Sequence, residues 1–468
     1  MVVKSHNRNC MNCQLFLSVL LFGITVGLAQ PGSLIAYEYL GSMEAGEIET
    51  ALNIAFGPDA PTSIYSISMY SVAYEIQKSD GTADTLSGAV AFPHDPTKAF
   101  PIASYQHGTT ILDNAVPSIT GLSPENFEII FIAIVASSNG FITVFPDYMG
   151  LGISDGYHPY IIADPYTLAV TNLIRAIKYL PSEIDPIGSF QWNNQLYLLG
   201  YSEGGYATLA AQKGIEESVL DELPITASFP MAGPYDLSGT MVDYFLSIPD
   251  YPQPFYVANV LFTHLDYYGS LDDLDQYFLP AWADTLPILF DGTHSGWEIN
   301  DLMPDNPLDI LLPETLEEFT ADSSHFFRVT LAENTLLDWV PVTPTYLIHG
   351  MGDDIVPYAN SEVAYIDFIL GGALDVTLVN ISESEGGHAE VALSCILYAY
   401  ETMLLYQAVS PKGDIDGDGN LSENDFDLLV QSILNGAALG AFETWAGDWD
   451  YDGSHSIFDL TAISLAID

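Results

Sequence analysis

The chain has few basic residues for its length. Only 9 of its 468 residues are lysine or arginine, against 62 aspartates and glutamates, which gives a formal net charge of −53 at pH 7. Such a protein is repelled by nucleic acid and by anionic membrane surfaces, so both are excluded as partners. Its carboxylates need solvated cations to limit their mutual repulsion, and a saline environment is therefore a hypothesis. Activity and stability that are best without added salt would contradict it.

Cysteine is also scarce. Three cysteines are too few for a disulfide framework. Cys10 and Cys13 form a CxxC pair, but they precede an apolar run and would be removed with it. Cys395 would then remain alone in the apolar stretch 392–397, where we expect it to be buried as a small hydrophobic side chain.

A hydrophobic run long enough to cross a bilayer is missing. The apolar run Leu15–Phe22 is short, follows Lys4 and Arg8, and leads to the small residues around Ala29. This pattern is typical of a secretory signal peptide, with an uncleaved membrane anchor as the alternative. We therefore expect residues 1–29 to be removed. The mature protein is predicted to be secreted, periplasmic or at the cell surface, and not to be an integral membrane protein.

Strand-like and helix-like segments alternate through most of the chain. This order predicts an α/β fold, with a mostly parallel sheet flanked by helices. The predicted strands are Ser87–Phe92, Ile102–Gln106, Ile142–Phe145, Leu196–Gly200, Thr226–Met231, Thr345–His349 and Val376–Ile381. The predicted helices are Glu125–Ser138, Pro165–Leu180, Gly205–Glu216, Ala359–Leu370 and Ala389–Tyr406.

Two segments interrupt this alternation and define the expected domains. Residues 238–342 are rich in aromatics and prolines, and we expect a helical cap inserted between sheet strands. Such a cap would either select apolar ester groups or be a plain helical insertion. The composition changes again at Ser410-Pro411-Lys412-Gly413. We therefore expect a catalytic domain over residues 30–409 and a small C-terminal module over residues 410–468.

A candidate nucleophile lies in Gly200-Tyr201-Ser202-Glu203-Gly204. The apolar run 195–199 leads into this motif, and a helix-forming stretch follows it. A sharp turn between strand and helix holds such a serine in a strained conformation at the positive end of the helix, and glycines let the two elements approach closely. Ser202 is therefore the predicted nucleophile.

A serine hydroxyl needs a general base, and the base needs a carboxylate that orients it. In this arrangement the chain order is serine, acid, histidine. Asp353 follows a predicted strand and is preferred to the adjacent Asp354, which is expected to cap the following helix or meet solvent. His388 lies in a glycine-bearing loop before the last helix of the catalytic domain and is the predicted base. For the other two histidines at strand ends, His107 and His349, we expect packing or hydrogen-bonding roles.

An oxyanion intermediate needs two main-chain N–H donors. One is expected from Glu203, through its main chain and not through its carboxylate. The other should come from the loop after an early strand, and residues 105–110 fit that position. Thr109 is the preferred donor, with Gly108 as the alternative.

These motifs together resemble the α/β-hydrolase superfamily, and within it the secretory lipase family and its bacterial relatives. The matching pieces are Tyr105–Thr109, Pro146–Gly152, Gly200–Gly205, and His349-Gly350 with Asp353 and Val356-Pro357. The resemblance implies hydrolysis of carboxylic esters, small or lipid, through an acyl-enzyme, with no cofactor for catalysis. A serine peptidase on the same fold and an inactive surface binding protein are the alternatives.

Two acidic loops in residues 410–468 repeat the pattern of a calcium-binding loop. Each has oxygen-bearing side chains at positions 1, 3, 5 and 12, glycine at position 6, and a backbone carbonyl ligand at position 7. Aspartate replaces the usual glutamate at position 12, and each loop leads into an apolar helix without a clear helix before it. The candidate ligands are Asp414, Asp416, Asp418, Asn420 and Asp425, then Asp448, Asp450, Asp452, Ser454 and Asp459.

This repeat pair resembles a type I dockerin, a small all-α, EF-hand-like module. The resemblance implies calcium-dependent folding and docking onto a cohesin partner. Positions 10 and 11 are Glu423-Asn424 and Ile457-Phe458, where many dockerins have small hydroxyl residues, and basic helix residues are missing. A purely structural calcium module is therefore an equal interpretation.

Overall fold

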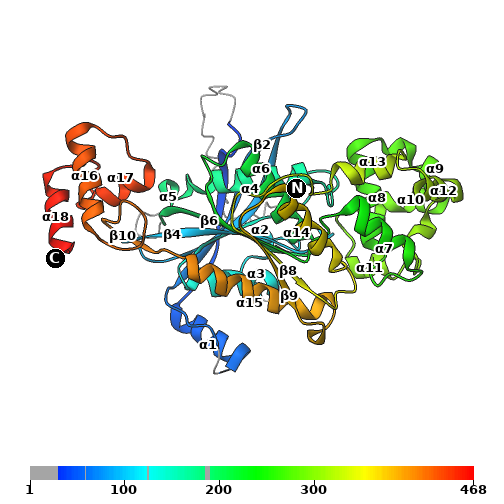
Figure 1. The fold of residues 1–468 in the computed structure, drawn as a ribbon, viewed down its shortest axis with the longest axis horizontal. Coiled ribbons are helices and arrows are strands. Elements are labelled where there is room, and N and C mark those ends of the chain that lie inside the picture. Colours follow the sequence, from blue (N-terminus) through cyan, green and yellow to red (C-terminus); the bar gives the residue numbers. More distant parts are fainter. Residues whose placement is uncertain (1–29, 58–59, 124–125, 185–189, 468) are drawn as a thin grey trace, which may run out of the picture.

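The computed structural model describes residues 30–467, apart from 58–59, 124–125 and 185–189 (Figure 1). The predicted signal peptide, with Cys10 and Cys13, lies outside the described residues. Cys395 is buried and unpaired, as its apolar surroundings in the sequence predict.

A large sheet forms the centre of the molecule (Figure 1). Its strands follow the order β1-β2-β3-β5-β4-β6-β7-β8-β9. From β5 to β9 along this order every pair is parallel, whereas β1, β2, β3 and β5 pair in the antiparallel sense. The predicted mostly parallel sheet is thereby confirmed. The strands are β1 Leu34–Met43, β2 Ile67–Gln77, β3 Ala83–Pro93, β4 Lys98–Gln106, β5 Ile142–Pro146, β6 Trp192–Tyr201, β7 Ile225–Met231, β8 Thr345–Gly350 and β9 Val376–Ile381.

Successive side chains of the central strands enter two separate hydrophobic cores. In β6, Leu196 and Leu198 pack in one core, and Tyr197 and Leu199 pack in the other. Side chains alternate in direction along a strand, so a sheet covered on both faces needs apolar residues at every position. This explains the continuous apolar run before the serine motif. The first core includes α4 Ala163–Ile177, α6 Glu203–Ser218 and α14 Ala359–Gly371, and the second includes α1 Ala45–Phe56, α3 Phe127–Ser138 and α15 His388–Tyr406.

The segment predicted as a cap lies between β7 and β8. It forms a lobe of short helices at one end of the molecule (Figure 1). Two of them begin at proline, whose fixed φ suits the first turn of a helix. These helices are α7 Val242–Ser247, α8 Phe255–Tyr268, α9 Leu274–Tyr277, α10 Pro280–Leu289, α11 Gly296–Asn300, α12 Pro313–Ala321 and α13 Phe326–Glu333.

The C-terminal module occupies the opposite end of the molecule (Figure 1). Its helices are α16 Glu423–Asn435, α17 Ala441–Gly447 and α18 Ile457–Ile467. Helix α17 lies directly before the second acidic loop, where the sequence shows no clear helix, so that expectation is wrong for the second repeat. The segment is short, and it gains burial from Phe442 and Ala446 in the core of the module.

The module is joined to the catalytic sheet by more than a linker. Strand β10, Ser410–Pro411, pairs with the start of β4. Ala99 of β4 belongs to the hydrophobic core of the module, and the Asn193 side chain in β6 donates to the carbonyl of Ala408 (2.8 Å). The body that contains the large sheet therefore supplies part of the packing that holds the module.

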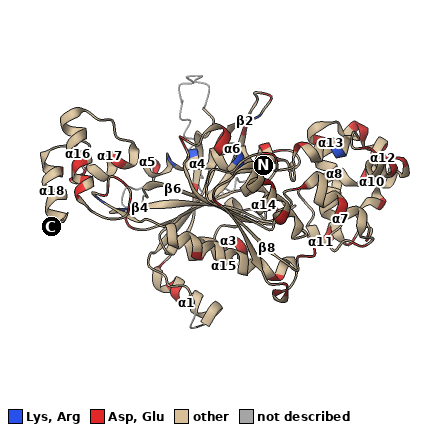
Figure 2. Cartoon of the chain, in the orientation of Figure 1, with Lys and Arg blue, Asp and Glu red and all other residues tan. Residues whose placement is uncertain are grey.

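Acidic residues are spread over the cap, the body and the module (Figure 2). No helix in the described ranges is both long enough and apolar enough to cross a membrane.

Candidate active site

Ser202 stands at a strained turn between β6 and α6. Its backbone has φ 61° and ψ −120°, a left-handed φ that side-chain-bearing residues rarely adopt. The Ser202 N–H donates to the carbonyl of Met231 (2.9 Å), which fixes the turn against β7. The strain is therefore held by the sheet, and the hydroxyl lies at the start of a helix.

The glycines beside the serine allow strand and helix to approach closely. A Cβ atom at Gly200 would lie 2.4 Å from the carbonyl oxygen of Gly204. A Cβ atom at Gly204 would lie 2.0 Å from the carbonyl oxygen of Gln106. Neither contact is possible, so both positions require glycine, as the motif predicts.

His388 links Ser202 to Asp353. Its Nε2 atom is 2.8 Å from the Ser202 Oγ atom, and its Nδ1 atom is 2.6 Å from the Asp353 Oδ2 atom. His388 is the first residue of α15, after the loop that follows β9. The structure thus brings together the three side chains that the sequence predicts as nucleophile, base and acid.

Asp353 is buried and held by four donors. Its Oδ1 atom accepts from the N–H groups of Ile355 (3.0 Å) and Val356 (2.8 Å). Its Oδ2 atom lies near both His388 and His349, the latter at 3.2 Å. Burial raises the pKa of the Asp353 carboxyl, but hydrogen bonds from His349 and His388 outweigh this and hold that pKa well below its ordinary value. His349 therefore supports the acid, in line with the hydrogen-bonding role expected for it.

Asp354 is exposed to solvent, as one of the two expectations for it has it, whereas the other expectation, a cap on the following helix, is wrong. Its Oδ1 atom accepts from the main-chain N–H of His388 at 3.0 Å, so it caps the start of α15 and not the next helix in the chain, α14. The loop after β8 lies directly beneath the start of α15, which is why a residue 34 positions away receives the bond. Asp353 orients the imidazole, and Asp354 holds its backbone.

The candidate oxyanion donors lie on the loop after β4 and at the start of α6. The Gly108 N–H donates to the Glu128 Oε1 atom (3.2 Å). Because this N–H group already has an acceptor, it is not free to donate to an oxyanion. The Thr109 hydroxyl is 2.9 Å from that of Tyr160. Glu203 is the first residue of α6, where main-chain N–H groups have no partner within the helix. Of the two alternatives on this loop, the occupied N–H of Gly108 favours Thr109, and Glu203 stays the predicted other donor.

His107 and Glu128 both contact Gly108 in the loop after β4. The His107 ring stacks on Tyr148 with 4.2 Å between centroids, and its Nδ1 atom is 2.8 Å from the Gly108 carbonyl, as expected for a packing and hydrogen-bonding role. The hydroxyl of Tyr105 donates to the half-buried Glu128 carboxylate. Glu128 could not be selected from the sequence, because it lies on a helix with no motif around it.

Two cavities meet the candidate triad. The first lies beneath the cap and has an almost entirely apolar lining that includes Ser202 and Glu203. The second reaches His388 and Thr109, with Trp297 and Asp354 also in its wall. An apolar cavity beside the candidate nucleophile and a more polar one beside the candidate base can receive two different parts of a substrate. The apolar lining is contributed mainly by Tyr160, Leu237, Met241, Phe245, Tyr251, Tyr256, Val260, Leu261, Leu308, Phe319 and Leu331.

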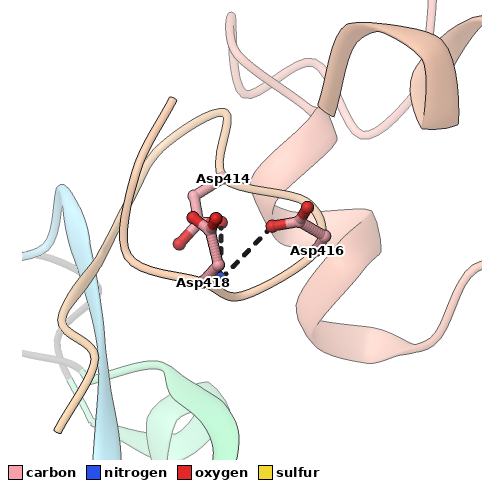
Figure 3. Close-up of side chains that lie close together, drawn as sticks. All are labelled: Asp414, Asp416 and Asp418. Carbon is pink, nitrogen blue, oxygen red and sulfur yellow. Dashed lines mark hydrogen bonds between the residues drawn. The ribbon is translucent and has the colours of Figure 1, made fainter. Parts of the chain in front are cut away.

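The first acidic loop of the C-terminal module gathers three carboxylates. Asp414, Asp416 and Asp418 each offer an oxygen atom, and these atoms lie within 4.8 Å of one another (Figure 3). Gly419, at position 6, has a φ of 86°, which makes the sharp turn. The second loop gathers Asp448, Asp450 and Asp452 in the same way.

The aspartates at position 12 are not part of these groups. Asp425 accepts from the N–H groups of Ile415 and Asp416 and from both donors of Ser422. Asp459 repeats this pattern in the second loop. Both aspartates join the end of their loop to its start by accepting from main-chain N–H groups. Asn420 and Ser454 occupy position 7, where a carbonyl oxygen is the expected ligand.

A mostly parallel sheet flanked by helices, with a serine at the turn from strand to helix, is the arrangement of α/β-hydrolases. Comparison with protein-family models finds no match, and comparison with curated proteins finds none. Solved structures do match, and they are hydrolases, esterases and lipases.

Three of these structures illustrate the likeness. A candidate hydrolase from Legionella pneumophila is 28% identical, covers 80% of this chain and 98% of its own, and gives a TM-score of 0.71. The rice cell wall degrading esterase LipA from Xanthomonas oryzae is 25% identical, with coverage of 80% and 99% and a TM-score of 0.70. Lipase A from Candida antarctica, in its closed state, is 18% identical, with coverage of 77% and 78% and a TM-score of 0.58, and shows the fold alone.

Proposed function

We propose that the protein is a carboxylic ester hydrolase that works through an acyl-enzyme on Ser202. The observation that carries this proposal is the position of His388, within hydrogen-bond distance of both Ser202 Oγ and Asp353 Oδ2. The hydrolase, esterase and lipase neighbours support it.

The geometry supports the following course of reaction. Ser202 Oγ attacks the ester carbonyl while His388 Nε2 takes its proton, and Asp353 stabilises the imidazolium that forms. The N–H groups of Glu203 and Thr109 stabilise the oxyanion. His388 then gives the proton to the leaving alcohol, and a water molecule, deprotonated by the same histidine, releases the acid and restores Ser202.

The two cavities suggest how a substrate divides between them. The acyl group would lie in the apolar cavity beneath the cap, where its carbonyl carbon reaches Ser202. The alcohol would leave on the side of His388, in the second cavity. Because one neighbour is a cell wall degrading esterase, esters attached to cell wall polymers are candidate substrates. We also propose export from the cytoplasm, because the predicted signal peptide precedes the catalytic domain.

A substrate panel tests this function. We expect a fluorophosphonate probe to label the wild-type protein, and p-nitrophenyl esters to be cleaved with an activity that depends on acyl length. Peptide amides of matched side chains should be cleaved at least 100-fold more slowly. Cleavage of amides alone would make the protein a peptidase. A folded wild-type protein that stays unlabelled would favour the inactive binding protein instead.

We propose that the two acidic loops bind calcium as structural sites. The clustered carboxylate oxygens are the ligands that calcium prefers, and glycine makes the required turn in each loop. Burial, and then the neighbouring Asp425 carboxylate, raise the pKa of Asp414 to about 6, although hydrogen bonds partly oppose this. A bound cation would relieve that cost. Docking onto a cohesin remains a prediction of the sequence resemblance.

Removal of calcium is expected to destabilise the whole protein. The module shares its core with Ala99 of the catalytic sheet, so the intact chain is the right sample. At 100 times the dissociation constant, calcium would add about 2.7 kcal/mol to the free energy of unfolding, and EDTA should lower the melting temperature accordingly. Calorimetry of calcium binding to the wild type and to a D414N/D416N variant measures the site directly. No calcium binding by the wild type would contradict this proposal.

A further inference from the structure

The side chain of Glu203 takes part in a buried network that the proposed mechanism does not use. The Oε1 atom of Glu203 accepts from the Tyr166 hydroxyl (2.9 Å) and lies 2.8 Å from the Nε2 atom of His158. The Oε2 atom is buried and has no hydrogen-bond partner among the described residues. Within that part of the chain, His158 is the one basic side chain paired with Glu203.

The atoms around His158 indicate how many protons His158 and Glu203 hold between them. Its Nδ1 atom lies 2.8 Å from the carbonyl oxygen of Met149, which can only accept, so Nδ1 carries a proton. If Nε2 carried no proton, its lone pair would face a lone pair of the Glu203 Oε1 atom across 2.8 Å, and the two would repel each other. The Tyr166 hydroxyl also lies 3.3 Å from Nε2, but it is closer to Oε1, to which it donates at 2.9 Å. The second proton that the 2.8 Å contact needs therefore lies between Nε2 and Oε1. The pair has no net charge, although one of its members is a buried carboxylic side chain.

The surroundings favour an imidazolium beside a carboxylate. The Tyr148 ring stacks on the His158 ring, with 5.7 Å between centroids and an interplanar angle of 13°. The face of an aromatic ring attracts a cation. The hydroxyl of Tyr166 donates to the same Glu203 oxygen that faces His158, and such a hydrogen bond stabilises the charged form of a carboxyl group.

We propose that His158 is a positioning residue of the serine turn: it neutralises the Glu203 carboxylate, so that the main-chain N–H of Glu203 can stabilise an oxyanion. This inference rests on the proposed ester hydrolysis. An unneutralised carboxylate on the residue that donates to the oxyanion would repel the charge that develops there, and water does not screen that repulsion in a buried site. The chain has only 9 lysines and arginines, and a histidine supplies the positive charge.

A double-mutant cycle on the full chain tests this proposal. H158Q keeps a side chain that can donate to Glu203 but removes the positive charge, and we expect kcat for a short p-nitrophenyl ester to fall about 10- to 100-fold with KM changed less than about threefold. H158Q/E203Q leaves no buried charge, and we expect its kcat to be at least about tenfold above that of H158Q. A packing role would not give this rescue, because a second substitution in one packed site adds to the damage.

His264 provides the matched control. It is fully buried in α8, its Nδ1 atom is 3.0 Å from the Thr330 hydroxyl, and burial lowers its pKa to about 4, so it is neutral at pH 7. H264Q removes a buried histidine without removing a charge, and its kcat should stay within about threefold of wild type.

Three results would overturn the proposal. These are a wild-type kcat in H158Q, a double variant no more active than H158Q, and a double variant that does not fold. If H158Q alone fails to fold, a folded and active double variant still supports charge neutralisation. Fluorophosphonate labelling of the wild type distinguishes failure of the proposed function from failure of the role of His158. An unlabelled wild type overturns the proposed function. A labelled wild type, with no rescue in the double variant, overturns only the role of His158.

Discussion

Replacing Ser202 by alanine is expected to lower kcat for ester hydrolysis by about 10⁴- to 10⁶-fold. The substitution removes the oxygen that attacks the ester, while the main-chain donors and the cavities stay in place. Folding should change little, because alanine meets the same backbone strain at a φ of 61° as serine does. Initial rates at high enzyme concentration, with a melting curve for each protein, measure both effects.

Ser228 offers a matched control for this variant. It is fully buried in β7, and its hydroxyl has no hydrogen-bond partner among the described residues. S228A should therefore keep kcat within about twofold of the wild type. Retention of more than about 1% of wild-type kcat by S202A would place the nucleophile elsewhere.

The D353N variant is expected to lose about 10³- to 10⁴-fold in kcat. An amide nitrogen in place of Oδ2 would donate to Nδ1 of His388 and so leave the proton on Nε2. That tautomer cannot accept the proton of Ser202. Measurement of kcat/KM for one activated ester, for which the leaving group needs no protonation, isolates this loss of base function.

D354N distinguishes the two adjacent acids. Asp354 accepts from the backbone N–H of His388, and an amide oxygen can accept the same bond. We expect D354N to lose at most about tenfold in kcat, far less than D353N. A larger loss in D354N than in D353N would show that the acid has been assigned to the wrong residue.

The stability difference between wild type and D353N should depend on pH. The pKa of Asp353 is lower in the folded protein than in the unfolded chain, so its interactions stabilise the fold fully above the ordinary carboxyl pKa of about 4. This contribution is lost as the pH falls below that value toward the folded-state pKa. Urea unfolding at pH 7 and at successively lower pH should show the difference narrowing.

Most of the strands that the sequence predicts are covered on both faces. Strands β3 to β8 are mostly buried on both faces and form apolar runs that are visible in a sequence. Strand β9 lies at the sheet edge and is only partly buried, and it was predicted from its β-branched and apolar residues. Strand β1 was missed because most of it is exposed, with Tyr37 and Tyr39 more than two-fifths accessible. Strand β2 was also missed, and β10 has only two residues, which is too short for any pattern.

The candidate triad could be predicted because the sheet topology places its three members at the same edge of the sheet. Each member follows a strand of the parallel sheet, and the carboxyl ends of those strands meet at one edge. Glu128 and His158 escaped prediction because they reach the site from segments with no characteristic spacing. The role of Asp354 depended on which helix start lies above its loop, and only the three-dimensional arrangement decides that.

The C-terminal module is attached at the starts of β4 and β6, and this determines which end of the sheet it covers. Ala99 and Asn193 lie where these strands begin, whereas Ser202 lies just beyond the end of β6. The ten residues of β6 span about 33 Å, so the module and Ser202 lie at opposite ends of this strand. A molecule held by its module would therefore turn the cap and the candidate site toward its surroundings.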